Sequence, residues 1–536
     1  MQIVIPSTRS ALVPGLLAAL AAIAATPAFA QSEASAEPEP GMWAFDGELT
    51  GQPGRSLQID TQLGRGMVVS YLGYRADGSA LFLQASGYRA QDDNGFTGEL
   101  REFRNGPVIG GQTANGEVAG SAGTLRLAFD TPVSGTVTLP GEAPRRIARF
   151  TYGAQELSRV TGFRKDVQLT VHSRERFPGT ATYALQFSGG NFQLVQTSTR
   201  DGSLCSYAGP YQLRSESIVS AEGTKLCTDA AGNQQRSTYR QGHFRFDNEN
   251  FLSGSVRTEG RDEFFTGPCQ AGAVLGNSPV APCSQAWYGQ PALQPGMWSF
   301  DDELDGRPGR SVQIDHLANS GMLVVSYLGY RGDGSSMFLQ GAAYFGFLYN
   351  QTYTFALKEY RRGPVIGGPV TPGEEAATIG EAQLTFDSPT SGILTLPGEM
   401  PRRISRYRYE DHTVRFDKAF EGYGYPSAHT PGTPMSIDIV ARAGVFRMDT
   451  LTGDTSLACR YRGTYRLTGE GLFTEGSRSC GTLDAATSAP YSGEIAVNEN
   501  GLLRARLTEN GRSPVLISAG CSNGRLCTRA ELQRPR

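Results

Sequence analysis

Residues 66–88, GMVVSYLGYRADGSALFLQASGY, return almost unchanged as residues 321–344, GMLVVSYLGYRGDGSSMFLQGAAY. In each copy a run rich in Val and Tyr, residues that favour strands, leads to a short turn and then to a second apolar run. The turn contains Gly78 or Gly334, and glycine accepts the positive φ that tight hairpins require. This stretch therefore predicts a β-hairpin that occurs twice in one chain.

The repeat extends well beyond this hairpin. Residues 40–84 match residues 295–340 at 32 of 45 positions, with Leu323 as a one-residue insertion. GPVIGG occurs at 106–111 and 363–368, and LPGE, one variable residue and PRRI occur at 139–147 and 396–404. A period of about 256 residues is too long for a solenoid repeat, so we infer a duplicated pair of modules.

The second part of each half matches more weakly, as in CSYAGPY at 205–211 and CRYRGTY at 459–465. We therefore predict four modules in the order A-B-A-B. The predicted segments are a signal peptide (1–30), a polar spacer (31–39), module A1 (40–153), module B1 (164–287), module A2 (295–410) and module B2 (413–530).

The A modules are predicted to be rows of short strands. In A1, Leu125, Leu127 and Phe129 alternate with Arg126 and Ala128, a pattern typical of a half-buried strand. About eight such strands with close turns indicate an antiparallel meander. The predicted fold class is all-β, with tandem meander barrels; two-sheet sandwiches are the alternative.

The first thirty residues predict export. Arg9 precedes an apolar run from Ala11 to Ala25, and Ala28-Phe29-Ala30 forms a small-x-small cleavage site. These features are typical of a secretory signal peptide, so we expect a periplasmic or extracellular protein. No later stretch approaches the 18 apolar residues of a spanning helix, and we expect no transmembrane segment in the mature chain.

Eight cysteines, four in each half, agree with an oxidising compartment. Four cysteines allow three connectivities. We favour local disulfides, namely Cys205–Cys227, Cys269–Cys283, Cys459–Cys480 and Cys521–Cys527.

Composition excludes several classes of function. The net charge of −3 argues against a strongly basic nucleic-acid-binding protein. The five His residues fall at unmatched places in the two halves, and no GxSxG or HExxH motif occurs, which argues against a Ser-His hydrolase or a zinc protease. We expect no metal and no cofactor.

The A modules resemble a β-rich module that recurs in exported proteobacterial proteins, sometimes as a tail on secreted proteases. The resemblance is carried by Gly64-Arg65-Gly66, by Tyr74 with Gly78 and Phe82, by Thr97-Gly98-Glu99-Leu100 and by Gly106-Pro107. It implies export and a β fold, and it implies no activity. The B modules resemble no family that we recognise.

Three sets of side chains are candidates for chemistry. Asp46 and Glu48, matched by Asp301 and Glu303, could form a glycosidase pair, or could be ion partners of Arg55 and Arg310. Acids 301–305 could bind calcium, although their spacing fits no EF-hand. Arg331-Gly332-Asp333 is an RGD tripeptide, which we interpret as turn chemistry because the first copy has Ala76 in the middle.

Repeated aromatic residues are the candidate ligand-binding side chains, because such rings can stack on sugars or apolar ligands; core packing is the alternative. They are Trp43, Tyr71, Tyr74, Trp298, Tyr327 and Tyr330. We predict an exported, non-catalytic protein that binds an unidentified ligand, surface polymer or partner protein. The alternative is a carboxylate-dependent polysaccharide hydrolase.

Overall fold

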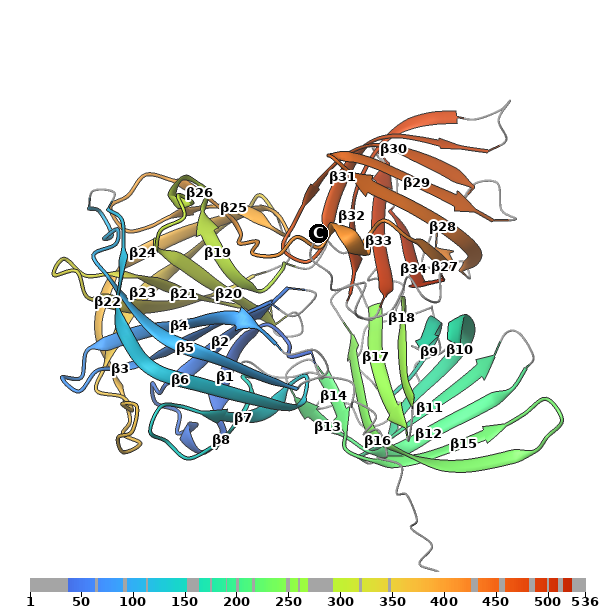
Figure 1. Ribbon diagram of the computed structural model, residues 1–536, viewed down its shortest axis with the longest axis horizontal. Helices are drawn as coiled ribbons and strands as arrows, with labels where there is room; N and C mark the ends of the chain where they lie inside the picture. The colour runs from blue at the N-terminus through green and yellow to red at the C-terminus, as the bar shows by residue number, and fades with distance from the viewer. Residues whose placement is uncertain are drawn as a thin grey trace, which may run out of the picture.

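The computed structural model describes most of the chain (Figure 1). The described residues are 37–62, 66–89, 94–111, 114–151, 163–173, 176–188, 190–198, 202–214, 217–246, 251–258, 261–268, 293–317, 321–345, 349–425, 432–452, 458–481, 487–498, 501–509 and 514–522. The predicted signal peptide, most of the spacer and the segment 269–292 between the halves lie outside them.

The fold is all-β, as predicted, with four β modules in tandem. Module A1 is a closed barrel of eight strands, and its first strand pairs with its last through Ala44 and Ala148. Its elements are β1 (Gly41–Phe45), η1 (Asp46–Glu48), β2 (Ser56–Thr61), β3 (Gly66–Tyr74), β4 (Ala80–Tyr88), β5 (Gly95–Arg104), β6 (Glu117–Thr131), β7 (Ser134–Thr138) and β8 (Arg145–Arg149).

Apolar side chains that alternate with exposed side chains along the strands fill the interior of this barrel. Leu125, Leu127 and Phe129 of β6 are buried, whereas Arg126 and Ala128 between them are exposed. Successive side chains of a strand point to opposite faces of the sheet, so one face of β6 supplies the core and the other faces water.

Module A2 repeats the same closed barrel. Its elements are β19 (Gly296–Phe300), η4 (Asp301–Glu303), β20 (Ser311–Leu317), β21 (Met322–Tyr330), β22 (Ser336–Tyr344), β23 (Thr352–Arg361), β24 (Glu374–Ser388), β25 (Ser391–Thr395) and β26 (Arg402–Arg406). The quoted hairpin forms β3 and β4 in the first copy and β21 and β22 in the second, with Tyr74 opposite Ala80 and Tyr330 opposite Ser336.

Module B1 is a ten-stranded sheet in the order β13-β14-β16-β15-β12-β11-β10-β9-β18-β17, in which β16 also pairs with β17. The strands are β9 (Phe163–Ser173), β10 (Arg176–Ser188), β11 (Asn191–Ser198), β12 (Leu204–Pro210), β13 (Gln212–Arg214), β14 (Ser217–Ser220), β15 (Gly223–Thr228), β16 (Gln234–Phe246), β17 (Phe251–Thr258) and β18 (Arg261–Pro268).

Module B2 is a third closed eight-stranded barrel. It follows η5 (Thr413–Arg415) and consists of β27 (Ala419–Tyr425), β28 (Thr433–Arg442), β29 (Val445–Leu451), β30 (Cys459–Leu467), β31 (Leu472–Cys480), β32 (Thr487–Val497), β33 (Leu502–Glu509) and β34 (Val515–Cys521). For these three modules, closure decides between the barrel and the sandwich.

Two of the expected disulfides are present. Cys205 and Cys227 are bonded across β12 and β15, and Cys459 and Cys480 across β30 and β31. Each pair occupies directly opposite positions of neighbouring strands. The expected pairs Cys269–Cys283 and Cys521–Cys527 involve residues outside the described part of the chain.

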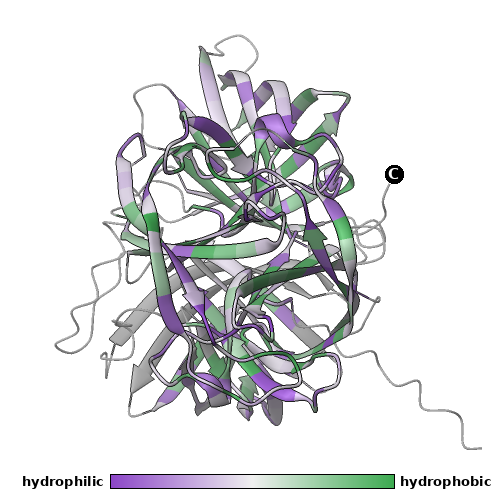
Figure 2. Cartoon of the chain, turned by 90° about the vertical axis from the view of Figure 1, so that its left-hand side faces the viewer, coloured by the Kyte–Doolittle hydropathy of each residue, from purple (hydrophilic) through white to green (hydrophobic). Residues whose placement is uncertain are grey.

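The two A barrels lie side by side on the left of Figure 1, with B2 and B1 to their right. Figure 2 views the molecule from the side of the A barrels and shows apolar and polar segments alternating along the strands. Among the described residues, none of the helices has the length and apolar character to cross a membrane.

Candidate functional site at the interface of the A barrels

The six candidate aromatic residues are all buried, with at most 1% of each side chain exposed. Trp43 and Tyr71 lie inside the A1 barrel, and Trp298 and Tyr327 lie inside A2. Tyr74 belongs instead to a cluster shared by the two barrels. Core packing accounts for these positions, and the ligand-binding role stays a prediction.

The candidate acid Glu48 lies in a buried ion-pair cluster at one end of A1. Arg55 donates to Glu48 at 2.8 Å and to Glu142 at 2.6 Å, and its guanidinium lies 4.5 Å from the Phe45 ring. Arg145 also contacts Glu48, at 3.1 Å. Burial opposes the charge on Arg55, but the hydrogen bonds to Glu48 and Glu142 raise its pKa further above the usual range.

The same cluster is built in A2. Arg310 contacts Glu303 at 2.8 Å and Glu399 at 2.5 Å, and Arg402 also contacts Glu303. Burial raises the pKa of Glu303, and Arg310 opposes this shift. In both barrels the matched acid is therefore an ion partner of arginines, whereas its neighbour, Asp46 or Asp301, is exposed.

Each cluster is completed by a loop from the other barrel. The backbone N–H of Gly367, in the second GPVIGG motif, donates to Glu142 at 2.8 Å, and that of Gly110, in the first, donates to Glu399 at 2.9 Å. The isoleucine of each motif reaches the opposite core, because Ile366 packs against the A1 cluster and Ile109 against the A2 cluster. The two barrels thus exchange loops.

Two buried ion pairs cross the interface in the same reciprocal way. Arg149 of β8 contacts Asp315 of A2 through both terminal nitrogens, at 2.7 and 2.5 Å, and Arg406 contacts Asp60 at the same distances. The Met42 N–H donates to Asp315 at 2.8 Å. All four charged residues are at most 4% exposed, so each charge relies on its partner in the other barrel.

An aromatic cluster fills the centre of the interface. Tyr74 meets Phe338, and Phe82 meets Tyr330, each edge-on with ring centroids 6.2 Å apart. The approach is close, since a Cβ added at Gly106 would lie 2.0 Å from the Tyr330 ring and one added at Gly363 would lie 2.0 Å from the Tyr74 ring. Glycine is required at both positions.

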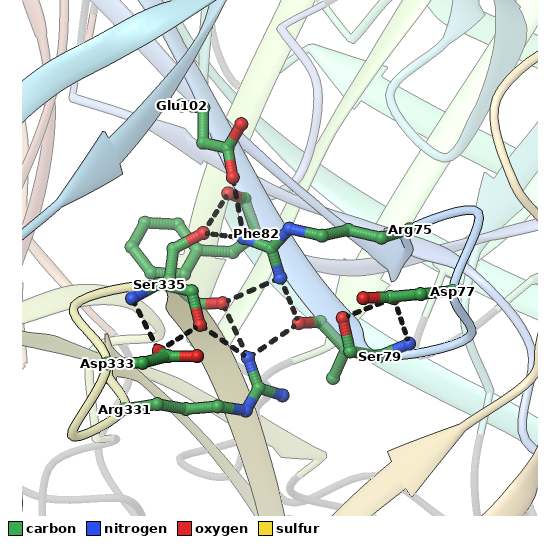
Figure 3. A network of polar contacts seen from close by, with 10 residues as sticks. Arg75, Asp77, Ser79, Phe82, Glu102, Arg331, Asp333 and Ser335 are labelled. Carbon is green, nitrogen blue, oxygen red and sulfur yellow. Dashed lines mark hydrogen bonds and ion pairs between the residues drawn. The ribbon is translucent and has the colours of Figure 1, made fainter.

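The RGD tripeptide is part of this interface (Figure 3). Arg331 donates to the Ser336 carbonyl at 2.9 Å and to the Ala80 carbonyl of A1 at 3.2 Å, while Arg75 donates to the same two carbonyls at 3.1 and 2.9 Å. Asp333 accepts hydrogen bonds from the Ser335 N–H and hydroxyl. These contacts agree with turn chemistry.

A hollow of about 230 Å³ lies on one seam between the barrels. Its lining residues are Glu48, Thr50, Gln52, Pro53, Gly54, Pro364, Val370, Thr371 and Pro372. At the equivalent seam of the second copy, the Asn115 amide bonds to Asp305 at 2.8 Å and to Arg307 at 2.9 Å. Polar contacts therefore bridge the two barrels at this second seam.

A Ser-His-Glu group that the sequence analysis missed fixes residues 37–40 to module B1. His243 Nε2 lies 3.0 Å from the Ser217 hydroxyl and 3.4 Å from Glu39, and the Ser217 hydroxyl donates to Glu39. Burial opposes ionisation of Glu39, but Arg245, His243 and Ser217 lower its pKa to about 2.

This group lacks the arrangement of a catalytic triad, in which the two imidazole nitrogens face the serine and the acid separately. Here Nε2 faces both, and Ser217 is fully buried. The sequence offered no local pattern for this group, because Glu39 and Ser217 are 178 residues apart.

No group of three or more His, Cys, Asp or Glu side chains within the described ranges could hold a metal ion. This includes acids 301–305, of which Glu303 is paired with arginines.

No protein-family model matches the chain, and no curated protein matches it. Among solved structures, it is similar to intact Ap-TbpB with its N and C lobes (9% identity, TM-score 0.18, covering 72% of this chain and 83% of that one). It is also similar to isotype 1 transferrin binding protein B of serogroup B Neisseria meningitidis (10%, 0.17, 83% and 86%). A third similar structure is a mutant of the transferrin binding protein B of Haemophilus parasuis (8%, 0.17, 78% and 94%). Likeness at TM-scores this low assigns no function to this chain.

Proposed function

We propose that this protein is an exported, non-catalytic binding protein. The proposal rests on the positions of the repeated motifs, which build the interface between the A barrels. PGRS, GPVIGG, LPGE and PRRI converge on the ion-pair clusters and loops that join the A barrels. Catalysis by carboxylates needs acids that reach the substrate, whereas Glu48 and Glu303 are occupied by arginines.

Binding is assigned to surfaces that both A barrels expose. Tyr88 and Tyr344 are each 69% exposed, and Leu49 and Leu304 are 61% and 57% exposed. Two equal surfaces on one chain gain avidity when they engage a polymer together. A ligand with repeating units, such as a surface polysaccharide, suits this duplication.

The test combines binding and turnover on one set of probes. Purified mature protein is incubated with peptidoglycan sacculi and with lipopolysaccharide, and both cosedimentation and new reducing ends are measured. We expect binding without reducing ends. Tyr88→Ala with Tyr344→Ala should reduce cosedimentation more than either substitution alone, whereas Val445→Ala, on the exposed surface of B2, serves as the control.

Release of reducing ends would favour the hydrolase. In that case Asp46→Asn separates the roles of the acids, because Asp46 is exposed and makes no cluster contact, whereas Glu48→Gln also breaks the buried ion pairs. Loss of turnover in Asp46→Asn at unchanged stability would overturn the non-catalytic proposal.

Export is proposed from the signal peptide and supported by the two disulfides, since disulfides persist in oxidising compartments. Mass spectrometry of the natively exported protein should find a mature chain starting near Gln31 with no reactive thiol. An uncleaved chain with free thiols would contradict the proposal.

A further inference from the structure

The central contacts between the A barrels are made twice by equivalent residues, whereas Gln62, which bonds to Tyr407 and Tyr409, has Leu317 as its equivalent. Arg149 binds Asp315 and Arg406 binds Asp60; Tyr74 lies on Gly363 and Tyr330 on Gly106; Ile109 enters the A2 core and Ile366 the A1 core. Such reciprocity is the property of an isologous, two-fold interface. The A1 face consists of Asp60, Tyr74, Gly106, Ile109 and Arg149, and the A2 face of Asp315, Tyr330, Gly363, Ile366 and Arg406.

We propose that each face is self-complementary, so that an A1 barrel released from A2 pairs with the A1 barrel of a second copy of this chain. A1 carries both members of every exchanged pair, since Asp60 and Arg149 lie on the same barrel, as do Tyr74 and Gly106. The residue types of the two faces are identical position by position. A second A1 face therefore offers the same charges, rings and glycines as the A2 face.

A difference between the copies near the centre is compatible with this pairing. Ala80 of A1 stands where A2 has Ser336, but Arg75 and Arg331 bind the backbone carbonyls of both residues. A backbone acceptor is independent of the side chain. With Ala80 at this position, the two hydrogen bonds of the Ser336 hydroxyl across the interface would be lost, from Arg75 at 2.9 Å and to the Phe82 carbonyl at 3.5 Å.

Pairing within the chain prevails in the native protein because the halves are linked. A tether raises the effective concentration of the partner barrel to the millimolar range for short linkers. A second copy becomes the preferred partner only when the A2 face is made unsuitable.

The experiment changes the shape of the A2 face and leaves A1 untouched. Gly363→Phe places a ring where Tyr74 of A1 lies, and Tyr330→Ala leaves a gap beside Gly106. In this variant A2 no longer fits A1, but its new ring and gap fit a second A2 of the same kind. We expect the full-length double variant to sediment as a dimer, whereas the wild-type chain sediments as a monomer.

The control restores the fit within the chain. Adding Tyr74→Ala and Gly106→Phe gives A1 the same ring and gap, and this four-substitution variant should return to a monomer. A folded, monomeric double variant would overturn the proposal. The proposal would also be overturned if the double variant is unfolded while the four-substitution variant is folded. Pairing between copies would then have failed to replace pairing within the chain.

A second measurement identifies which barrels meet and does not depend on the stability of the four-substitution variant. Arg104 of A1 lies opposite Ser335 of A2, and Ser79 lies opposite Arg361. In an A1–A1 pair, Arg104 of one copy would lie opposite Ser79 of the other. Two tagged chains of the double variant are used, one with Ser79→Cys and the other with Arg104→Cys, and they are unfolded and refolded together at increasing concentration.

We expect a disulfide between the two tagged chains whose yield rises with protein concentration. Exchange of whole halves would put the new cysteines opposite Arg361 and Ser335, and would give no such bond. Arg104→Cys with Ser335→Cys in one otherwise wild-type chain is the geometric control, since it should form a disulfide within the chain. The proposal would be overturned if the control disulfide forms within its chain but no disulfide forms between the two tagged chains at any concentration.

Discussion

At the level of single residues, Trp43 shows what a side chain shared by both copies of the repeat contributes to the fold. Its ring is fully buried, meets Phe129 edge-on with centroids 5.5 Å apart, and donates from Nε1 to the Glu39 carbonyl at 3.0 Å. Trp298 repeats this arrangement with Phe386 and the Gln294 carbonyl. Each tryptophan thereby ties the segment before the first strand to its barrel.

Trp43→Ala should lower the free energy of unfolding by about 3–5 kcal/mol, because it removes a buried ring and leaves a cavity. Urea denaturation measures the loss. Leu49→Ala, at a side chain that is 61% exposed, should stay within about 0.5 kcal/mol of the wild type. An equal effect of the two substitutions would contradict this account.

Asp315 forms one of the buried ion pairs between the A barrels, and its substitution should lower the stability of the protein. Asp315→Asn leaves the Arg149 guanidinium buried without its anion, and breaking a buried pair from one side costs about 3–5 kcal/mol. Asp130→Asn is the control, since its partner Arg146 is about half exposed, and exposed pairs contribute about 0–1 kcal/mol. A loss below 1 kcal/mol for Asp315→Asn, measured by urea denaturation, would show that water reaches the pair.

Arg362 adopts a left-handed backbone conformation, with φ of 62°, at the position where the first copy has Asn105 with φ of 61°. Asparagine tolerates this region, whereas it costs most other residues roughly 1–2 kcal/mol. Arg362→Asn should therefore raise the unfolding free energy by roughly 1 kcal/mol. Arg361→Asn, at an extended neighbouring position, should give no gain in the same thermal or urea unfolding measurement.

At the element scale, the loops between β5 and β6 and between β23 and β24 act outside their own barrels. Both strands of each hairpin are long, and the connecting loop carries the GPVIGG motif to the opposite barrel end. The barrels therefore share part of their cores, and the stability of each depends on a loop of the other.

Ile366→Ala, a substitution in A2, should increase hydrogen exchange mainly in the strands of A1, because its side chain packs against the A1 cluster. Mass spectrometry of peptides from 41–149 and 296–406 distinguishes the barrels. Ile393→Ala, on the 41% exposed face of β25, is the matched control in the same barrel. Loss of protection confined to 296–406 would mean that the loop stabilises only its own barrel.

At the scale of the whole molecule, four modules bury titratable groups between them, and this makes stability depend on pH. Burial lowers the pKa of His316 in A2 and of His412, just before η5, to about 4 each. His412 Nε2 donates to the Gly471 carbonyl at 2.9 Å, a contact that by itself raises the pKa, so burial outweighs it.

The two histidines should therefore contribute most stability above pH 6.5 and lose it as the pH is lowered towards 4, whereas Glu494, whose burial raises its pKa to about 7, contributes the opposite trend. In that window the unfolded chain binds protons at these histidines and the folded chain does not, a loss of about 3 kcal/mol per histidine when complete. Urea denaturation at pH 8, 6 and 5 measures the slope. His316→Thr introduces the residue type that the first copy has at Thr61. It should reduce the slope of the unfolding free energy against pH by about one proton, and an unchanged slope would contradict the role of His316.

The strands, the hairpins and the duplication could all be predicted from the amino-acid sequence. These are local properties: alternation is read over a few residues, turns need glycine at particular positions, and a repeat is visible without any structure. The sequence also indicated Cys205–Cys227 and Cys459–Cys480 as pairs close in sequence; the second joins the two strands of a hairpin, whereas β13 and β14 lie between the strands that the first joins. The predicted boundaries of the modules remain a proposal, as do the ligand-binding aromatic residues.

The contacts that the repeated residues make could not be predicted before the fold was known. Alternation cannot distinguish a ring that fills a core from one that binds a ligand, since both are apolar; burial distinguishes Trp43 and Tyr71. Nor could it pair Arg149 with Asp315, because the two are 166 residues apart and each would suit a solvent-exposed position equally well. The pairing arises only when two equal barrels meet face to face, where each charge needs the partner that the other copy supplies.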